Sequence, residues 1–99
     1  MFLEVVLGVG NNLIKDIDTT LARLGLLSGT IRLMRVDTSP SGTWPTNFGI
    51  AKTGSVILQM SYSSNVEYQV LFRNNLEGKM FYRVRQTDWG EWKEISFVN

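Results

Sequence analysis

The side chains with the most chemical potential gather near the end of the sequence. One short stretch there supplies the aromatic residues Tyr82, Trp89 and Trp92 and the arginines Arg83 and Arg85. Flat aromatic faces can stack on sugar rings, and guanidinium groups can donate hydrogen bonds to hydroxyls or phosphates. This combination predicts a surface that binds a carbohydrate.

A β-hairpin is predicted to position these side chains. Residues 80–85 alternate between two faces of an extended strand, residues 87–90 interrupt the alternation with turn-forming residues, and residues 92–97 can extend again. Trp89 and Trp92 are three positions apart, so an unbroken strand would send them to opposite faces. A bulge or turn after Trp89 can bring both to the same side.

The predicted receptor-binding site is centred on this turn, because binding residues concentrate on loops held by a rigid β scaffold. Its predicted members are Trp89, Arg83, Arg85, Tyr82, Trp44, Asp88 and Glu91. Trp89 is expected to be the exposed ring and Trp92 the buried anchor, with the loop around Trp44 as a second wall. A structural interpretation stays open beside it, in which the tryptophans plug the end of a small sandwich, since large rings are usually buried.

The sequence offers little for catalysis. It contains neither His nor Cys, which removes the commonest general base, the commonest transition-metal ligand and thiolate chemistry. The acidic residues are scattered, and no spacing holds two carboxylates across a cleft as glycoside hydrolysis requires. We therefore predict no enzymatic activity, no catalytic residues, no cofactor and no metal site.

The charge balance limits the partners. Ten basic and nine acidic residues give a net charge of +1, which provides no electrostatic basis for binding nucleic acid or an anionic membrane. Residues 1–10 are apolar but lack a basic start and are too short to span a bilayer. A short strand is favoured there over a signal peptide, and no membrane insertion is expected.

The hairpin also carries a family resemblance. Tyr-Arg-Val-Arg at residues 82–85 leads into Trp-Gly-Glu-Trp-Lys-Glu-Ile at residues 89–95. This order resembles the C-terminal receptor-binding domain, of the pyocin-knob type, in phage tail-fibre and baseplate adhesins. The resemblance centres on residues 80–95, and the rest of the second half of the chain agrees more loosely. It implies a domain that closes a fibre, binds the bacterial surface and assembles as a homotrimer.

Residues 11–27 form the one predicted helix. Four apolar residues recur there at heptad spacing, with Ile or Leu at each a and d position: Ile14, Ile17, Leu21 and Leu24. Two interpretations are open, an amphipathic helix on the domain's own sheet and a short parallel coiled coil at an oligomer axis. The family resemblance favours the second, so these four residues are the predicted oligomer interface.

The remaining sequence predicts β-structure. Residues 29–37 form the first predicted strand, and residues 39–47, rich in Ser, Gly and Pro, form the longest loop. From residue 55 onward, alternating strands joined by short turns predict an antiparallel meander. The alternation predicts that much of the core comes from Val56, Leu58, Met60, Tyr62, Val66, Tyr68, Val70 and Phe72.

The predicted fold is mainly β, a small antiparallel β-sandwich or meander knob with one N-terminal α-helix. A length of 99 residues, 43% of them hydrophobic, suits a single modest core. Residues 1–28 are the predicted oligomerisation segment, and residues 29–99 are the predicted knob domain.

These features together predict the terminal knob of a phage or phage-like tail fibre. As a trimer in the virion, made in the host cytoplasm, it would bind a bacterial cell-surface polysaccharide through avidity. The alternative is a structural oligomerisation or attachment domain that binds other tail or baseplate proteins and no receptor. A carboxylate-dependent glycan hydrolase is the least favoured alternative.

Overall fold

The computed structural model describes residues 4–7, 12–26, 28–49, 52–73 and 79–95, and within them the chain is mainly β with no helix. The strands of these residues are β1 (Glu4–Leu7), β2 (Leu13–Asp16), β3 (Thr30–Ser41), β4 (Val56–Ser61), β5 (Val66–Phe72), β6 (Met80–Gln86), β7 (Asp88–Trp89) and β8 (Lys93–Ile95).

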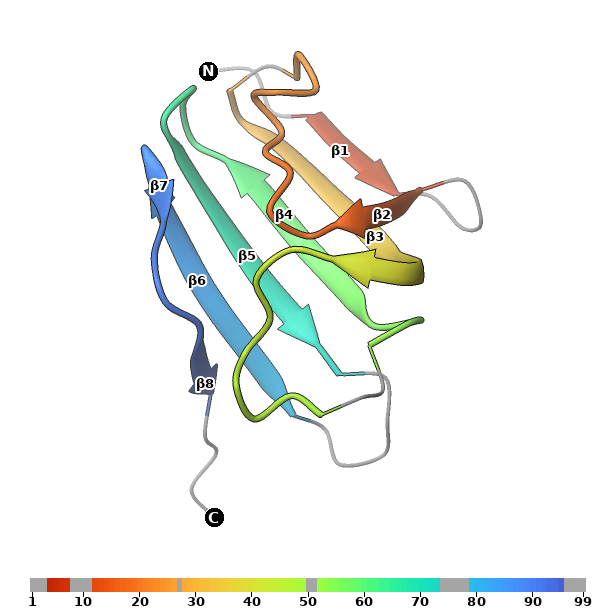
Figure 1. The fold of residues 1–99 in the computed structure, drawn as a ribbon. Helices are drawn as coiled ribbons and strands as arrows, with labels where there is room; N and C mark the ends of the chain where they lie inside the picture. Colours follow the sequence, from red (N-terminus) through yellow and green to blue (C-terminus); the bar gives the residue numbers. More distant parts are fainter. Residues whose placement is uncertain (1–3, 8–11, 27, 50–51, 74–78, 96–99) are drawn as a thin grey trace.

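All of these strands belong to one mixed sheet (Figure 1). Its order is β1-β3-β4-β5-β6-β7, with β2 pairing to β3 and β8 pairing to β6. The consecutive strands β3 to β6 are antiparallel, which confirms the predicted meander, whereas β1 and β2 run parallel to β3. The strand expected within residues 1–10 is confirmed as β1 at the sheet edge.

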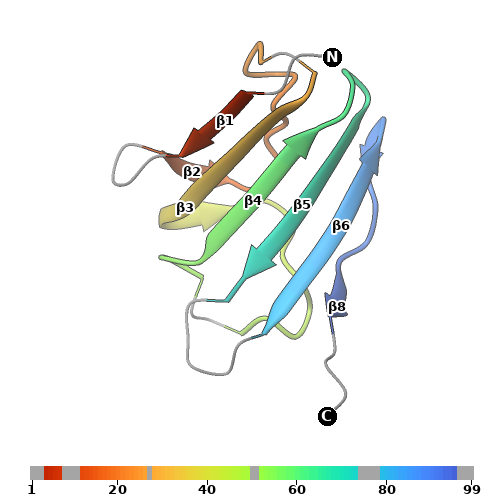
Figure 2. The same cartoon turned by 180° about the vertical axis from the view of Figure 1, so that it is seen from behind.

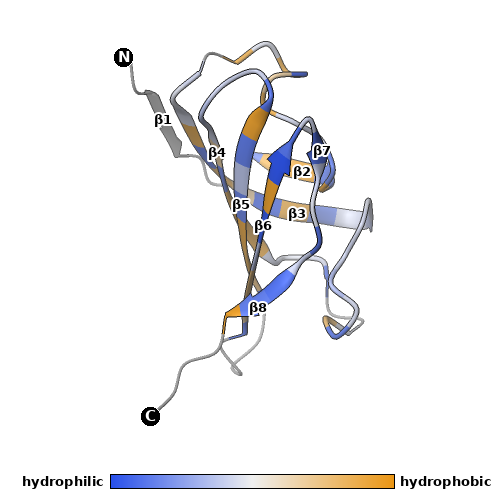
Figure 3. Cartoon of the chain, turned by 90° about the vertical axis from the view of Figure 1, so that its left-hand side faces the viewer, coloured by the Kyte–Doolittle hydropathy of each residue, from blue (hydrophilic) through white to orange (hydrophobic). Residues whose placement is uncertain are grey.

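The strand β3 is longer than predicted and bends over the sheet. It pairs with β4 only as far as Arg35, and Ser39 then adopts a positive φ of 51°. Its last residues meet β2, where Ser41 pairs with Asp16. Residues 42–49 continue across the same face, so two separate segments, 12–26 and 39–49, cover one side of the meander (Figures 1 and 3). We call this side the inner face.

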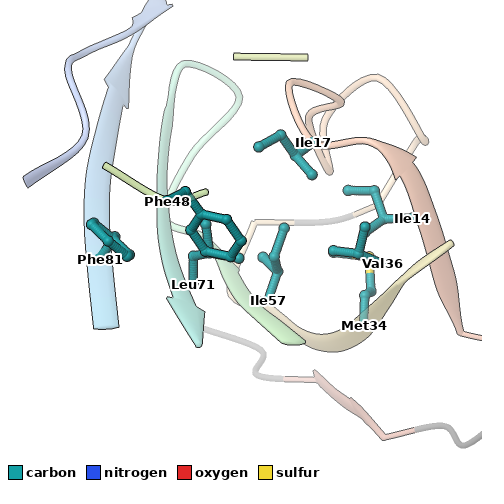
Figure 4. Close-up of a cluster of buried hydrophobic side chains, with 8 residues drawn as sticks. All are labelled: Ile14, Ile17, Met34, Val36, Phe48, Ile57, Leu71 and Phe81. Carbon is teal, nitrogen blue, oxygen red and sulfur yellow. The ribbon is translucent and has the colours of Figure 1, made fainter. Parts of the chain in front are cut away.

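The hydrophobic core lies between the inner face and these covering segments (Figure 4). The register aligns four buried side chains in one row across the meander: Met34, Ile57, Leu71 and Phe81. The covering segments add Ile14, Ile17 and Phe48, and Val36 comes from the bent end of β3. The ring of Phe48 lies 5.6 Å from that of Phe81, centroid to centroid, so the loop is packed into the core.

The predicted core face is wrong. Val56, Leu58, Met60, Tyr62, Val66, Tyr68, Val70 and Phe72 lie on the opposite side of the sheet, which we call the outer face, and none of them is buried. Alternation identified the strands correctly, but it could not tell which side the rest of the chain would cover. The inner face takes the other set of alternating residues, which contains most of the polar side chains.

The predicted N-terminal helix is also wrong. After β2 the chain runs through turns from Ile17 to Gly25. Local hydrogen bonds close these turns, such as Leu24 N donating to Thr20 O at 3.3 Å and Leu26 N to Leu21 O at 3.1 Å, but they do not continue into a helix. Ile17 and Leu21 are buried in the chain's own core, whereas Leu24 is 49% exposed. Polar side chains of the inner face bind the backbone of this segment, so its N–H and C=O groups do not need helical partners. Heptad spacing without a helix leaves no coiled-coil seam in the described residues.

The second sheet of a sandwich is not seen among the described residues. Turns and loops form the covering layer instead, apart from β2 and the end of β3, which belong to the same sheet as the meander.

Candidate ligand-binding groove

One of the two arginines of the predicted site, Arg83, holds the two tryptophans of the hairpin. Arg83 is 2% exposed, and its guanidinium carbon lies 4.3 Å from the ring centroid of Trp89 and 4.4 Å from that of Trp92. Both rings therefore pack against the same cation, each at a distance typical of a cation–π contact. The interruption of the hairpin at Gly90, whose N–H donates to Val84 O at 2.8 Å, brings both rings to the inner face as predicted.

The strands hold Arg83 in a buried ladder of polar side chains. Its Nε donates to Gln69 Oε1 at 2.7 Å, and Gln69 Nε2 donates to Gln59 Oε1 at 2.8 Å. Gln59 Nε2 in turn donates to Glu67 Oε1 at 2.8 Å. These residues are side by side because the register places Gln59, Gln69 and Arg83 in one row of the sheet.

This polar ladder also binds the covering segment. Gln69 Nε2 and Arg83 Nη2 both donate to Ile17 O, at 2.8 and 2.9 Å. The carboxylate of Glu67 accepts the backbone N–H groups of Leu21 and Ala22 at 2.8 and 3.1 Å. Buried polar side chains are stable only with such partners, so the ladder and the irregular segment stabilise each other.

Asp18 connects this ladder to the loop that carries Trp44. It accepts Arg83 Nη2 at 2.8 Å, Thr43 N at 3.0 Å and Thr43 Oγ1 at 3.0 Å. Burial raises the pKa of Asp18, but the hydrogen bonds from Arg83 and Thr43 and the charge of Arg83 outweigh it, so the pKa lies below its ordinary value. Burial likewise lowers the pKa of Arg83, against the opposing influence of Asp18 and Asp16, and the side chain stays cationic.

A groove of about 290 Å³ lies beside this assembly. Its lining residues are Thr43, Trp44, Pro45, Thr46, Glu91 and Trp92. Trp92 Nε1 donates to Thr43 O at 2.6 Å, which joins the two sides of the groove. The groove therefore lies where residues 43–46 of the loop meet residues 91–92 of the hairpin.

The loop side of the groove is held by the core. The Trp44 ring packs on Phe48 at 4.9 Å between centroids, its Nε1 donates to Ser41 O at 3.3 Å, and Lys52 Nζ lies 5.6 Å from the ring centroid. Glu91 and Thr46 are exposed at the rim. Two half-buried indole rings, a carboxylate and threonine hydroxyls therefore share one small concave surface, which suits a ring with an apolar face and hydroxyl edges.

The structure brings some of the predicted site residues together and separates others. Trp44 and Glu91 line the groove. Trp89 does not line it but packs against Arg83, with its Nε1 donating to Asp18 O at 2.9 Å. Asp88 is exposed on β7 beside Trp89.

The other predicted site residues are arranged differently. Arg83 is buried, and Arg85 is half-buried beside Glu67 at 3.6 Å. Tyr82 is on the outer face, away from the groove, because neighbours in a strand point to opposite sides. Trp92 is half-buried and lines the groove, and so joins the candidate site.

Sequence reasoning missed the buried ladder and the place of Asp18 in it. Gln59, Glu67 and Gln69 alternate along the strands with the residues of the predicted core, so the prediction placed them on the side of the sheet opposite to that core. A signal for the opposite assignment was present, because the same alternating set also contains Ile57, Leu71 and Phe81, which the register places in one row. No comparable signal marked Asp18.

Comparisons with protein-family models, with curated proteins and with solved structures found no match for this chain. Among the described residues, no cluster of three or more acidic side chains is placed to hold a metal ion. The described part of the chain likewise contains no helix that is long and apolar enough to cross a membrane.

Proposed function

We propose that this chain is a carbohydrate-binding module, the terminal knob of a phage-like tail fibre that recognises a bacterial surface polysaccharide as a homotrimer. The observation that carries the proposal is the groove in which Trp44 and Trp92, from distant parts of the sequence, meet with Glu91 and the threonine hydroxyls. The family resemblance of the hairpin agrees with this function and supplies its setting in a virion.

The groove has the chemistry for binding a sugar without cleaving it. A sugar ring stacked on an indole would bury its C–H face, while Glu91 would accept hydrogen bonds from hydroxyls, and charged acceptors make the stronger bonds. Glu91 is the one carboxylate among the lining residues, whereas hydrolysis of a glycoside in the usual way uses a pair. Binding at one small site would be weak, and three copies on a common axis would strengthen it through avidity.

A glycan array followed by titration calorimetry tests the proposal. Glu91→Gln should weaken binding of the selected oligosaccharide by about tenfold, the loss expected when a charged hydrogen bond worth about 1.5–3 kcal/mol becomes a neutral one. Glu94→Gln is the matched control, because Glu94 is also exposed but does not line the groove. Trp44→Ala should abolish binding, and its thermal midpoint should be measured because Trp44 also packs on the core.

Two results would count against the proposal. One is an array on which no surface polysaccharide binds. The other is binding that Glu91→Gln and Glu94→Gln affect equally, which would place the glycan elsewhere on the molecule.

A second function is favoured by a different observation. The outer face of the sheet carries many apolar side chains, of which Tyr62, Tyr68, Tyr82 and Val84 are exposed, as expected of a structural oligomerisation or attachment domain of a tail or baseplate protein. In that case other tail proteins would be the partners and the groove would bind no receptor.

A further inference from the structure

The outer face has the composition of an interior. The register of β3 to β6 arranges its side chains in rows: Ile31, Met60, Tyr68 and Val84, then Leu33, Leu58, Val70 and Tyr82, then Arg35, Val56, Phe72 and Met80. Of these, Tyr68 and Tyr82 are each 38% exposed and Val84 is 40% exposed. Arg35, at one corner, is the one charged residue in the rows.

The described part of the chain leaves this face uncovered. Figure 2 views the molecule from the outer side, and no described segment crosses in front of β3 to β6. The covering segments and the polar ladder are all on the inner face. Much of the inner face is therefore polar and the outer face is apolar, whereas in a one-sided sheet polar side chains commonly face water and apolar ones the core.

The outer face is as large as the largest apolar patch on a typical monomer. The paired stretches of β3 to β6 are five to seven residues long. With strands about 4.8 Å apart and about 3.4 Å per residue, the four strands cover roughly 330–450 Å² in projection, before the relief of the side chains is added. The largest apolar patch on a monomer is usually about 300–600 Å², and a standard interface takes about 800 Å² from each partner. In projection, the outer face is about half of the area that one partner contributes to a standard interface, and the relief of its side chains adds to that area.

We propose that copies of this chain pack against one another through the outer face. The outer face has few charges and several tyrosines and methionines, which is the composition of an interface core. Because its three rows contain one charged residue, the face offers little for recognising an acidic or basic partner. A second copy presents the same uncharged surface, and sheets stack face to face readily at about 10 Å. The number of copies, three, rests on the proposed function.

The width of the face suits a threefold arrangement. Three copies can be pictured as a triangular prism in which each side is the four-stranded sheet of one copy, about 19 Å wide. Every sheet then lies about 5.5 Å from the threefold axis, which is close to half of the ~10 Å between packed sheets. Side chains from three outer faces would thus meet at the axis. This interface replaces the coiled-coil seam, because Ile14, Ile17 and Leu21 are buried within their own chain.

Sedimentation velocity on the full chain tests the inference. The chain should sediment as an oligomer at about 100 μM, a concentration that populates even a weak interface. Val84→Glu and Tyr68→Glu should each raise the dissociation constant by about tenfold or more, because each buries a carboxylate in the interface. Leu24→Glu is the matched control, since Leu24 is similarly exposed but lies on the other side of the sheet and should leave assembly unchanged.

Tryptophan fluorescence verifies that each variant is folded. Because Val84 and Tyr68 are substituted separately, the test still stands if one of the two variants does not fold. A monomer at this concentration would overturn the inference, as would an oligomer that Val84→Glu and Tyr68→Glu leave intact. Glycan binding by the dispersed variants is measured separately. An intact groove in a monomeric variant should keep its affinity for a short oligosaccharide and lose only its adsorption to cells, so the two proposals can fail independently.

Discussion

Arg83→Met is the sharpest test of how the hairpin is held. The substitution removes the donor to Gln69 Oε1, one of two donors to Ile17 O, the ion-pair partner of Asp18 and the cation against which Trp89 and Trp92 pack. Gln69 is fully buried and would keep an acceptor without a partner, which costs about 1–3 kcal/mol. The two lost cation–π contacts add about 1–2 kcal/mol each, of which Met sulfur–ring contacts recover a part.

The losses together predict a fall of about 3–5 kcal/mol in the free energy of unfolding. Asp18 adds little to it, because Thr43 still donates to its carboxylate and its side chain is 34% exposed. For a chain of this length, the fall lowers the thermal midpoint by about 12 °C or more. Urea denaturation followed by tryptophan fluorescence measures it, since two of the three tryptophans contact Arg83.

Arg85→Met is the matched control. Arg85 is two residues further along β6 on the same face, but it makes one hydrogen bond, to Ser64 O at 3.2 Å, and a loose ion pair with Glu67 at 3.6 Å. Its loss should cost about 1 kcal/mol or less. Equal destabilisation by the two substitutions would refute the role given to the Arg83 ladder.

Three further predictions concern stability. Because the pKa of Asp18 is lowered in the folded chain, the unfolded chain binds a proton at this carboxylate more readily. The contribution of Asp18 to the free energy of unfolding is therefore complete above the ordinary pKa of about 3.9 and is lost as the pH falls through the folded value. Asp18→Asn should reduce that loss of stability when unfolding is measured at decreasing pH. Ile57→Ala should lower the free energy of unfolding of the monomer by about 2–4 kcal/mol in urea denaturation, whereas Leu58→Ala, on the outer face, should lower it by less than about 1.5 kcal/mol. The reverse order would show that the core lies on the face predicted from the alternation. Gly42→Ala should destabilise the fold by more than about 1 kcal/mol, because φ is 97° and a Cβ would lie 2.7 Å from Asp16 Oδ1. Gly25→Ala should cost less, because φ is 76° but a Cβ there would have nothing within 4 Å. Thermal midpoints that fall equally in the two variants would contradict the crowding at Gly42.

The strands were predictable from the sequence, and their faces were not. Period-two alternation placed β4 and β5 within a residue of their observed bounds, because it depends on backbone geometry that every strand shares. The choice of inner side depends on which segment covers the sheet, which is a long-range property. The prediction took the richer apolar set as the core, and the chain instead buries the set that contains Gln59 and Gln69.

The candidate site was predictable in part for the same reason. Trp44 and Glu91 were assigned to it and line one groove, because both belong to loops at the same place in the fold. Tyr82 and Arg83 were also assigned to one surface, although adjacent residues of a strand point to opposite sides. Strand geometry alone was therefore enough to exclude that pair.

The absence of a helix from residues 12–26 and the polar side chains on the inner face have a common cause. An irregular segment over a sheet leaves N–H and C=O groups that water cannot reach, so the face beneath it must supply partners. Glu67 accepts from Leu21 N, and Gln69 donates to Ile17 O, so polar side chains on the inner face perform this role. A helical segment would have satisfied its own backbone and left the inner face free to be apolar. Because many inner positions are occupied by polar side chains, much of the apolar content of β3 to β6 lies on the outer face, which no described segment of the chain covers.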